Sequence, residues 1–325
     1  MTKIRWGILG VAKIATNKVI PAMQRASNVE IAAIASRDFN KAKAAAEQLA
    51  IPGVYGSYEE LLADSSIDAI YNPLPNHLHV PWSIRAAEAG KHVLCEKPIA
   101  LSVAETRELI AARDKAHVKI GEAFMARTHP QWLRAAEIAR SGRIGELRVV
   151  SGHFSYFNRD PQNVRNIAEI GGGGIMDIGC YPITLSRMIF AAEPVGVHAF
   201  LDRDPEFKTD RLASVILEYP QGHASFTCST QLVPYQKMHI FGTTGHIEIE
   251  IPFNAPPDKP TRIFVNDEAE EFPVCDQYTI QGELFSRAIL ENTEVPVPLE
   301  DALKNMMVIE KILAGNAGAA INQSH

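Results

Sequence analysis

Two parts of the chain carry side chains that could exchange a proton with a substrate. Lys97 stands two residues after the short apolar run 92–95. Asp177 and Tyr181 stand four residues apart behind four consecutive glycines. Side chains at positions i and i+4 lie on one face of a helix, and glycines let a ligand or another backbone come close. We therefore expect an amine, a carboxylate and a phenol to serve one site, which suits removal of a proton from a hydroxyl group.

The roles of these groups depend on how their pKa values shift. A lysine that is partly buried beside a cationic ring, such as an oxidised nicotinamide, has a lowered pKa. Lys97 would in turn lower the pKa of Tyr181, so we favour the phenol as the proton acceptor, with Lys97 acting directly as the alternative. Coupled groups titrate as a pair, so both assignments stay open. Asp177 would bind a second hydroxyl of the substrate.

The first 120 residues alternate short apolar runs with helical patterns, which is typical of a parallel sheet covered by helices. Ser57 with Glu60, and Ser102 with Glu105, form S-x-x-E capping boxes that mark two helix starts. The predicted strands are Ile4–Leu9, Val29–Ala35, Ile67–Tyr71, His92–Cys95 and Val118–Gly121.

After residue 122 the alternation of strands and helices gives way to strand-like runs joined by turns. The segment 220–222 (Pro-Gln-Gly) indicates a hairpin between two of these runs. The pattern predicts an α/β protein with two domains, 1–122 and 123–325, of which the second is a mostly antiparallel α+β domain. The last helix could pack back on the first domain. The predicted helices are Pro130–Ser141, Ile175–Phe190, Thr279–Glu291 and Leu299–Gly315, and the predicted strands are Leu147–Phe157, Val195–Leu201, Ala213–Tyr219, His223–Thr230 and His246–Ile251.

A turn of small residues follows the first predicted strand. Gly10, Ala12 and Ala15 occupy the three positions of the G-x-G-x-x-G/A fingerprint, in which small residues let the backbone approach a pyrophosphate. The phosphates would lie at the N-terminus of the next helix, against Lys13 and Ile14. Ala12 departs from the pattern, because its Cβ narrows the approach. The turn predicts a dinucleotide site.

The end of the second predicted strand selects the cofactor. An NAD-preferring site usually places an acid there to bind the ribose 2′-hydroxyl, whereas this chain has Ser36 and Arg37. A guanidinium can bind a 2′-phosphate through two hydrogen bonds. NADP is therefore the expected cofactor, with NAD as the alternative, and we expect Asp38 to cap the next helix.

Two further turns belong to the same edge, since ligands bind outside the carboxyl ends of the strands in such sheets. The turn after residue 71 carries Pro73, Asn76 and His79, and the turn after residue 95 carries Glu96 beside Lys97. Prolines stiffen both turns. We expect these five side chains to contact the cofactor, and His79 is also a candidate for the wall of the substrate site.

Composition limits the classes of function. The chain has 325 residues, 46% of them hydrophobic and 22% charged, and its net charge is −6. An acidic surface does not favour nucleic acid or anionic membrane, and no apolar run approaches the roughly 20 residues that span a bilayer. The four cysteines form no C-x-x-C pair, so we expect reduced thiols, a cytoplasmic protein without a signal peptide, and no metal site.

Several motifs together resemble one family. The segment 90–98 (GKHVLCEKP), the turn 75–79 (PNHLH), the segment 122–125 (EAFM) and the segment 171–181 (GGGGIMDIGCY) are similar, in the same order, to those of the glucose–fructose oxidoreductase/inositol dehydrogenase (Gfo/Idh/MocA) family. The resemblance spans essentially the whole chain. It implies a doubly wound Rossmann domain followed by an open, mostly antiparallel sheet that often forms subunit contacts.

The resemblance also implies roles for individual residues. The family lysine falls on Lys97, its cofactor-contacting acid on Glu96 and its second-domain acid on Asp177. Tyr181 stands where inositol dehydrogenases often have histidine, which is similar to the branch of NADP-dependent xylose dehydrogenases and dimeric dihydrodiol dehydrogenases. Arg165 also resembles that branch, and it is a candidate for contact with the substrate, although a surface role is equally expected.

These observations predict an NADP-dependent oxidoreductase that transfers a hydride between nicotinamide and a sugar-like alcohol or carbonyl group. An aldose 1-dehydrogenase of the xylose type is the leading expectation. The alternatives are a dehydrogenase or reductase of a trans-dihydrodiol, an anhydro-sugar or a ketose, and a cofactor-binding regulator without turnover. We expect a sugar or polyol substrate and a homodimer or higher homo-oligomer formed through the C-terminal sheet.

Overall fold

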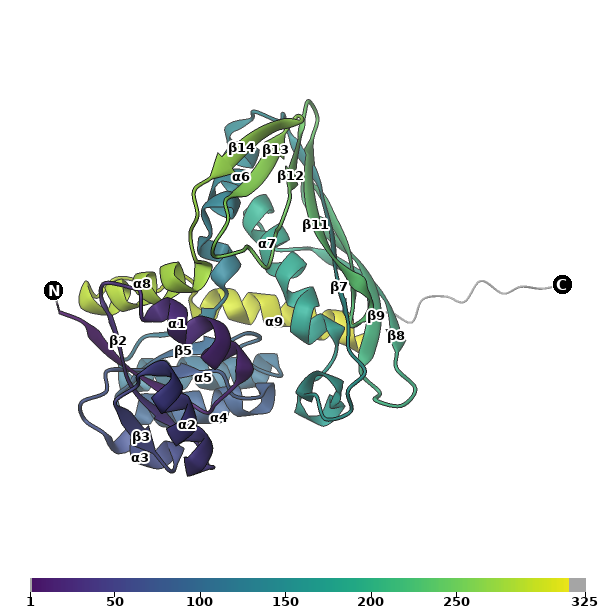
Figure 1. Cartoon of the computed structure of the whole chain (residues 1–325). Coiled ribbons are helices and arrows are strands. Elements are labelled where there is room, and N and C mark those ends of the chain that lie inside the picture. Colours follow the sequence, from purple (N-terminus) through teal and green to yellow (C-terminus); the bar gives the residue numbers. More distant parts are fainter. Residues whose placement is uncertain (1, 316–325) are drawn as a thin grey trace.

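The first sheet is parallel and occupies the N-terminal part of the chain. The computed structural model describes residues 2–315 and contains a six-stranded sheet in the order β3-β2-β1-β4-β5-β6 (Figure 1). All five pairings in it are parallel, which confirms the expected doubly wound arrangement. The strands are β1 (Ile4–Leu9), β2 (Val29–Ala35), β3 (Gly53–Tyr55), β4 (Ala69–Asn72), β5 (His92–Glu96) and β6 (Ile120–Ala123).

The helices between these strands begin where the sequence pattern places them. Ser57 accepts a hydrogen bond from the Glu60 amide, and Ser102 accepts one from the Glu105 amide, both at 3.1 Å. These caps satisfy first-turn amides that have no partner inside a helix. The helical segments are η1 (Ala15–Val19, a π turn), α1 (Ile20–Met23), α2 (Phe39–Leu49), α3 (Tyr58–Ala63), α4 (His79–Glu88) and α5 (Val103–Ala116).

The second sheet has eight strands in the order β14-β13-β12-β11-β7-β10-β9-β8. It is mostly antiparallel, with β7 and β10 as its parallel pair, and the expected hairpin joins β9 to β10. Its strands are β7 (Leu147–Phe157), β8 (Gly196–Arg203), β9 (Asp210–Tyr219), β10 (Gly222–Ser229), β11 (Gln231–Gly242), β12 (His246–Ile249), β13 (Thr261–Val265) and β14 (Glu268–Phe272).

One face of the second sheet is covered by helices α6 (Pro130–Ser141) and α7 (Cys180–Phe190), and the other face is open. The predicted helix 175–190 is not regular throughout, because it begins with a π turn, η6 (Ile175–Gly179). Such turns occur frequently at functional sites. This turn contains Asp177, and Tyr181 follows it in the first turn of α7.

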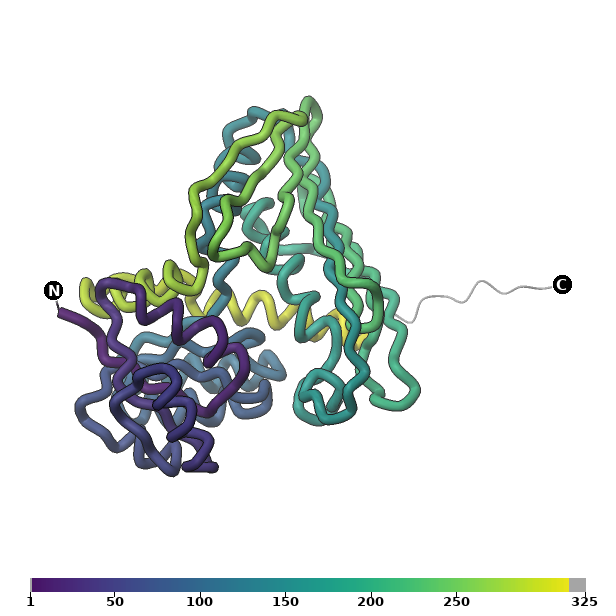
Figure 2. Tube along the Cα trace, in the orientation of Figure 1, coloured from purple at the N-terminus to yellow at the C-terminus, as the bar shows by residue number. Residues whose placement is uncertain are grey.

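The C-terminal helices return to the first sheet (Figure 2). Helix α8 (Gln277–Leu290) packs against α1 and β1, and Trp6 of β1 donates to the Ser286 hydroxyl at 3.1 Å. Helix α9 (Leu299–Ala314) packs on α5, where Arg113 pairs with Glu300 at 2.7 Å. The chain thus passes from the first sheet to the second after β6, and it returns to the first sheet through α8 and α9. Within residues 2–315, no helix is long and apolar enough to cross a membrane.

Candidate active site

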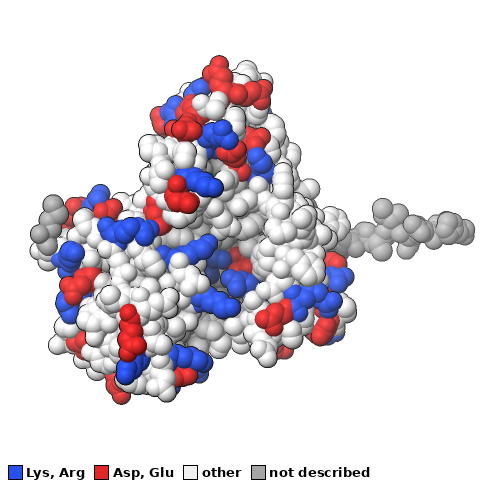
Figure 3. Space-filling view, in the orientation of Figure 1, with Lys and Arg blue, Asp and Glu red and all other residues white. Residues whose placement is uncertain are grey.

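A hollow lies between the two parts of the molecule, with basic side chains around it (Figure 3). Lys97 stands at the carboxyl end of β5, and its side chain is 12% exposed. Its Nζ donates to the main-chain oxygen of Asp177 at 2.5 Å, and the carboxylate Oδ1 of the same residue is 3.5 Å away. The amine of the first sheet and the acid of the second part therefore meet, in agreement with the roles that the resemblance implies for them.

The expected lowering of the Lys97 pKa is wrong for the protein on its own. Burial lowers the pKa of Lys97, but the interactions with Asp177 and Cys180 raise it by a larger amount. The net shift of the Lys97 pKa is therefore upward. The sequence argument considered only burial and a cationic ring. The counter-ion that reverses the sign comes from a residue 80 positions later.

Asp177 is the centre of the polar cluster. Its Oδ2 accepts hydrogen bonds from Arg165 Nε at 2.8 Å and from the Tyr156 hydroxyl at 2.7 Å. Burial raises the pKa of Asp177, yet the Lys97 and Arg165 cations and the Tyr156 hydroxyl outweigh it and hold the pKa at about 2. The acid is therefore ionised at neutral pH. Its Oδ1 faces only the more distant lysine, so this oxygen retains capacity to accept a substrate hydroxyl.

Tyr181 lies beneath the lysine, with its hydroxyl turned away. Lys97 Nζ is 4.8 Å from the centre of the Tyr181 ring, in a cation–π arrangement. The hydroxyl contacts the Met125 sulfur at 3.6 Å, and the ring packs against Phe124 and Phe154. Burial raises the pKa of Tyr181 well above its usual value. The expectation that Lys97 lowers this pKa is wrong, because the amine meets the ring face rather than the oxygen.

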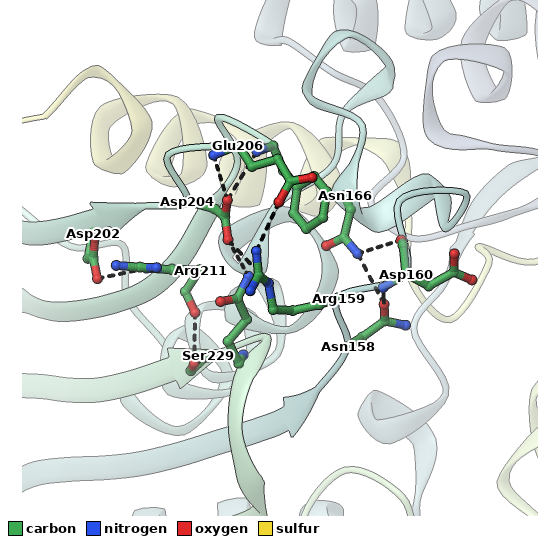
Figure 4. A network of polar contacts seen from close by, with 11 residues as sticks. Asn158, Arg159, Asp160, Asn166, Asp202, Asp204, Glu206, Arg211 and Ser229 are labelled. Atoms are coloured by element: carbon green, nitrogen blue, oxygen red, sulfur yellow. Dashed lines mark hydrogen bonds and ion pairs between the residues drawn. The ribbon is translucent and has the colours of Figure 1, made fainter.

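The segment 158–170 holds Arg165 over the cluster, and a network of polar contacts fixes this segment (Figure 4). Asn166 donates to the Asn158 side-chain oxygen at 3.0 Å, and Arg159 pairs with Glu206 at 3.0 Å. The Arg165 side chain is 46% exposed while its Nε binds Asp177. Its other guanidinium nitrogens therefore remain available to a ligand in the hollow.

The glycines before Asp177 serve close packing of the protein itself. A Cβ on Gly173, whose φ is +125°, would lie 2.1 Å from Asp210 Oδ1, and one on Gly172 would lie 2.6 Å from the Arg165 carbonyl oxygen. This space lets the buried Asp210 carboxylate accept a hydrogen bond from the Ile175 amide at 2.6 Å. Burial raises the pKa of Asp210 to about 6. The acid thus anchors the first turn of the segment that carries the cluster.

The dinucleotide end has the features that NADP requires. Gly10 has a φ of +79°, and the chain is helical from Lys13 onward, so the amides of that first turn lack acceptors within the helix. Ser36 and Arg37 follow β2, and Arg37 is exposed and forms no ion pair with any residue of 2–315. A phosphate at the helix start and a second one at the guanidinium fit these groups. Asp38 caps α2 as expected, accepting from the Lys41 amide at 3.2 Å.

The structure gives His79 a different role from the expected contact with cofactor or substrate. The ring is 1% exposed, and its nitrogens lie 2.8 Å from the Pro98 carbonyl oxygen and 2.7 Å from that of Leu74. A neutral imidazole donates through one nitrogen only, and burial lowers the pKa of His79 to about 4. His79 therefore links the two turns that carry Pro73 and Lys97 and does not line the hollow.

Of three other expected cofactor contacts, two have hydrogen-bond partners within the protein and one is buried in its turn. Asn76 donates to the Gly171 carbonyl oxygen at 2.9 Å, which ties the first domain to the glycine segment. Glu96 accepts from the Tyr71 hydroxyl at 2.7 Å, and burial raises the pKa of Glu96. Pro73 is buried in its turn. Glu96 is partly exposed beside Lys97 and retains room for a ligand.

Sequence reasoning missed two tyrosines at this site. Tyr156 of β7 binds Asp177, as described above. Tyr278 of α8 lines a groove of about 280 Å³ between α1 and the start of α8. Burial raises the Tyr278 pKa, and the nearby charges of Tyr181 and Glu96 add to the shift. Tyr156 stands near the end of a predicted strand and Tyr278 just before a predicted helix, and neither position carries a local signal for these contacts.

Family models match both halves of the chain. Residues 4–124 match the oxidoreductase family with an NAD-binding Rossmann fold, and residues 132–248 match the GFO/IDH/MocA C-terminal domain. An uncharacterized oxidoreductase of Rhizobium meliloti is 48% identical over 96% of each chain. D-xylose 1-dehydrogenase (NADP(+)) 2 of Haloferax volcanii is 39% identical over 97% of this chain and 98% of its own.

A solved structure extends the likeness to three dimensions. The 3-ketoreductase KijD10 of Actinomadura kijaniata, in complex with NADP and TDP-benzene, superposes with a TM-score of 0.89. The two proteins are 29% identical, and the match covers 97% of this chain and 98% of the other. Both halves of the sequence and the whole fold therefore agree with the resemblance seen in the motifs. The chain belongs to the GFO/IDH/MocA family of oxidoreductases.

Proposed function

We propose that this protein uses NADP to transfer a hydride to or from a sugar-like CH–OH or C=O group. The observation that carries the proposal is the Lys97 amine at the carboxyl end of β5, held by Asp177 from the other part of the molecule. An amine in this position could give up or take up a proton where ligands bind in doubly wound sheets.

The cofactor would be held by residues of the first domain. Amides at Ala12, Lys13 and Ile14 suit the pyrophosphate, because they surround the open start of a helix, and the turn at Gly10 leads the chain into that start. Ser36 and Arg37 suit the 2′-phosphate, and Glu96 together with the turn at Pro73 would face the nicotinamide end. When bound, NADP supplies or accepts the hydride. NADP is also present in the KijD10 complex and in the name of the Haloferax relative.

Lys97 is the proton-exchanging group in this proposal. Its ammonium can donate to the oxygen of a carbonyl that is being reduced, and the amine can take the proton back in oxidation. A positioned group of this kind contributes ~10²–10⁴-fold to the rate. Tyr181 supports the ammonium through its ring face, and Asp177 and Arg165 would bind neighbouring hydroxyls. In structures of KijD10 a tyrosine and a lysine have been substituted, and they are as far apart in that chain as Tyr181 and Lys97 are here.

The substrate we propose is an aldose, oxidised at C1 to the lactone, with xylose as the representative. Asp177 and Arg165 suit a compound with several hydroxyl groups, because polar groups that bind them discriminate against analogues without them. The named activity of the Haloferax relative supports the same choice. Reduction of a keto sugar is the second candidate, which the likeness to a 3-ketoreductase favours.

The open face of the second sheet would join two copies of the chain. Strand pairing places Phe200 and Ile216 on the same face as Tyr235 and Phe241. Phe200 is 75% exposed, and the other three are between 40% and 52% exposed. Exposed apolar side chains gathered on one face are typical of an interaction surface, so we propose a homo-oligomer formed through this sheet.

A substrate panel tests the proposed reaction. Absorbance of NADPH would be followed with aldoses, polyols, trans-dihydrodiols and keto sugars. We expect formation of NADPH with aldoses, and with xylose among the best. Turnover of diols alone or keto sugars alone would replace the substrate assignment while keeping the reaction type. Tight NADPH binding without turnover of any compound would contradict the enzyme and favour a cofactor-binding regulator.

A further inference from the structure

Glu122 is a buried acid with no role in the reaction described so far. It lies in β6, the edge strand beside β5, and is 4% exposed. Its Oε1 accepts a hydrogen bond from the Ile99 amide at 2.9 Å. Ile99 follows Lys97 by two residues, so this acid holds the turn that presents the proposed proton donor.

The same turn is held from its other side. His79 Nδ1 lies 2.8 Å from the Pro98 carbonyl oxygen, which belongs to the same peptide group as the Ile99 amide that donates to Glu122. The turn after Lys97 therefore lies between an imidazole of α4 and a carboxylate of β6. Glu122 and Lys97 share no hydrogen bond in the described chain. A change at Glu122 would nevertheless move Lys97, because Glu122 holds the Ile99 amide two residues further along the same turn.

The second oxygen of Glu122 has no hydrogen-bond partner among the described residues, and Glu122 lines a small, mostly apolar cavity. Oε2 makes no hydrogen bond to any described residue, and neither do the two amide atoms of Gln281, a residue of α8 that is 5% exposed. Both side chains line one cavity, together with Thr128 and the apolar Phe124 and Phe285. The cavity offers about 10 Å³ to the centre of a water molecule, and a site for one water needs about 10–15 Å³ and two to four polar partners.

The charges around Glu122 come from several elements. Lys97 after β5, Arg187 of α7 and Arg127 favour its ionised form, whereas Asp301 of α9 opposes it. The thiols of Cys95 and Cys180 lie near the same carboxylate. Burial is the largest influence and raises the pKa of Glu122 to about 7. The acid thus changes its charge near neutral pH.

We propose that Glu122 is a positioning residue for Lys97, and that one water molecule bound between its Oε2 and the Gln281 amide completes its hydrogen bonds. The proposal rests on the proposed role of Lys97 in proton transfer. The ionised carboxylate holds the Ile99 amide more strongly than the neutral acid and favours the ammonium form of Lys97. Below about pH 7 this support is lost as Glu122 takes up a proton, so carbonyl reduction slows.

Two variants and a pH profile test the positioning role. Glu122→Gln keeps the shape and the acceptor for Ile99 but removes the charge. We expect kcat for carbonyl reduction to fall about tenfold with an unchanged KM for NADPH, and the limb of the kcat profile near pH 7 to disappear. Gln281→Met, which replaces the amide with an apolar chain of similar size, should shift that limb to higher pH. Gln131→Met is the control, because it removes another buried amide, which binds the Ile251 carbonyl oxygen and does not line this cavity.

A crystal structure at high resolution tests the water directly. We expect one ordered water within hydrogen-bond distance of Glu122 Oε2 and Gln281 in the wild type, and none in Gln281→Met. A dry cavity would overturn the water. Wild-type kcat and pH profile in Glu122→Gln, with Lys97→Met inactive, would overturn the positioning role and leave the proposed function standing. If Lys97→Met is fully active, the proposed role of Lys97 is contradicted, and with it the proposed function. If Glu122→Gln does not fold, the pH profile of Gln281→Met tests the positioning role instead, and an unshifted limb would contradict it.

Discussion

At the scale of single residues, the site is organised by one carboxylate. Asp177 binds Arg165 and Tyr156 through one oxygen and faces Lys97 with the other. Two cations around one buried acid keep the acid ionised, and the acid keeps Lys97 protonated against the effect of burial. Because the pKa of Asp177 is lowered to about 2, its contribution to stability is present above the unfolded value near 4. That contribution is lost as pH falls through the folded value.

Removing the charge of Asp177 should reverse the shift at Lys97. In Asp177→Asn the burial of Lys97 is no longer offset, so we expect its pKa to fall below the ordinary value. The change can be measured by NMR of labelled lysine side chains, with Asp160→Asn as the exposed control. An unchanged Lys97 pKa would show that the acid is not its main counter-ion.

Arg37 should decide between the two cofactors. Loss of a charge-assisted hydrogen-bonding group costs about 1.5–3 kcal/mol, which corresponds to roughly a 10–100-fold rise in the Kd for NADPH. We expect Arg37→Ala to show this loss, measured by fluorescence titration, and to leave the Kd for NADH nearly unchanged. Lys43→Ala removes an exposed cation of the same helix region and should change neither. Equal losses for both cofactors in Arg37→Ala would remove the assignment to the 2′-phosphate.

At the scale of elements, local signals predicted most of the first sheet and its caps. The S-x-x-E boxes lie within four residues, and they predict the starts of α3 and α5. Short apolar runs predict strands β1, β2 and β5, at whose carboxyl ends ligands bind. Strand β11 did not, because Pro234 interrupts its pattern. The chain accommodates this proline at an irregular register between Gln231 and Tyr235, as prolines in sheets require.

The candidate site was predictable in part for the same reason. The positions of Lys97, Asp177 and Tyr181 could be predicted, because a strand end and a helix start are recognisable in the sequence. The structure brings the three side chains together. The contact of Tyr156 with Asp177 and the direction of the Lys97 pKa shift depend on how the second sheet packs against the first. Neither the spacing of residues nor their composition contains that information.

Asp210 should be needed to hold the segment that carries Asp177. Its carboxylate accepts the Ile175 amide in a buried place, and an unpartnered buried amide costs about 1–3 kcal/mol. We expect Asp210→Ala to lower the free energy of unfolding by that amount and to reduce kcat, because Asp177 loses its fixed position. Asp210→Asn retains an acceptor and is the control. Equal stability and activity in Asp210→Ala, measured by denaturant unfolding and steady-state kinetics, would contradict this anchoring role.

At the scale of the whole molecule, the chain crosses between its two sheets more than once. Helices α8 and α9 return to the first sheet, and α8 brings Tyr278 to the groove beside α1 and Gln281 to the small cavity beside Glu122. One continuous cluster of buried apolar side chains extends from Trp6 of β1 in the first sheet to Ile263 of β13 in the second sheet. The open face of the second sheet stays uncovered, with apolar side chains such as Phe200 and Tyr235 exposed on it.

That face should control the oligomeric state. Phe200→Asp combined with Ile216→Asp places two charges on the proposed contact, and burying unpaired charges opposes association. We expect the mass measured by light scattering to fall to that of one chain. Phe39→Asp, at an exposed apolar position of α2, should leave the mass unchanged. A double variant with the mass of the wild type would exclude this face as the contact.

The most direct test of the account compares Lys97→Met with Tyr181→Phe. Met keeps the length of the side chain without its proton, and Phe keeps the ring that lies under the amine. With saturating NADP and aldose, we predict that Lys97→Met lowers kcat by ~10²–10⁴-fold with unchanged NADPH binding, whereas Tyr181→Phe stays within about tenfold of the wild type. Full turnover in Lys97→Met, or a loss confined to Tyr181→Phe, would contradict the assignment of the proton to Lys97.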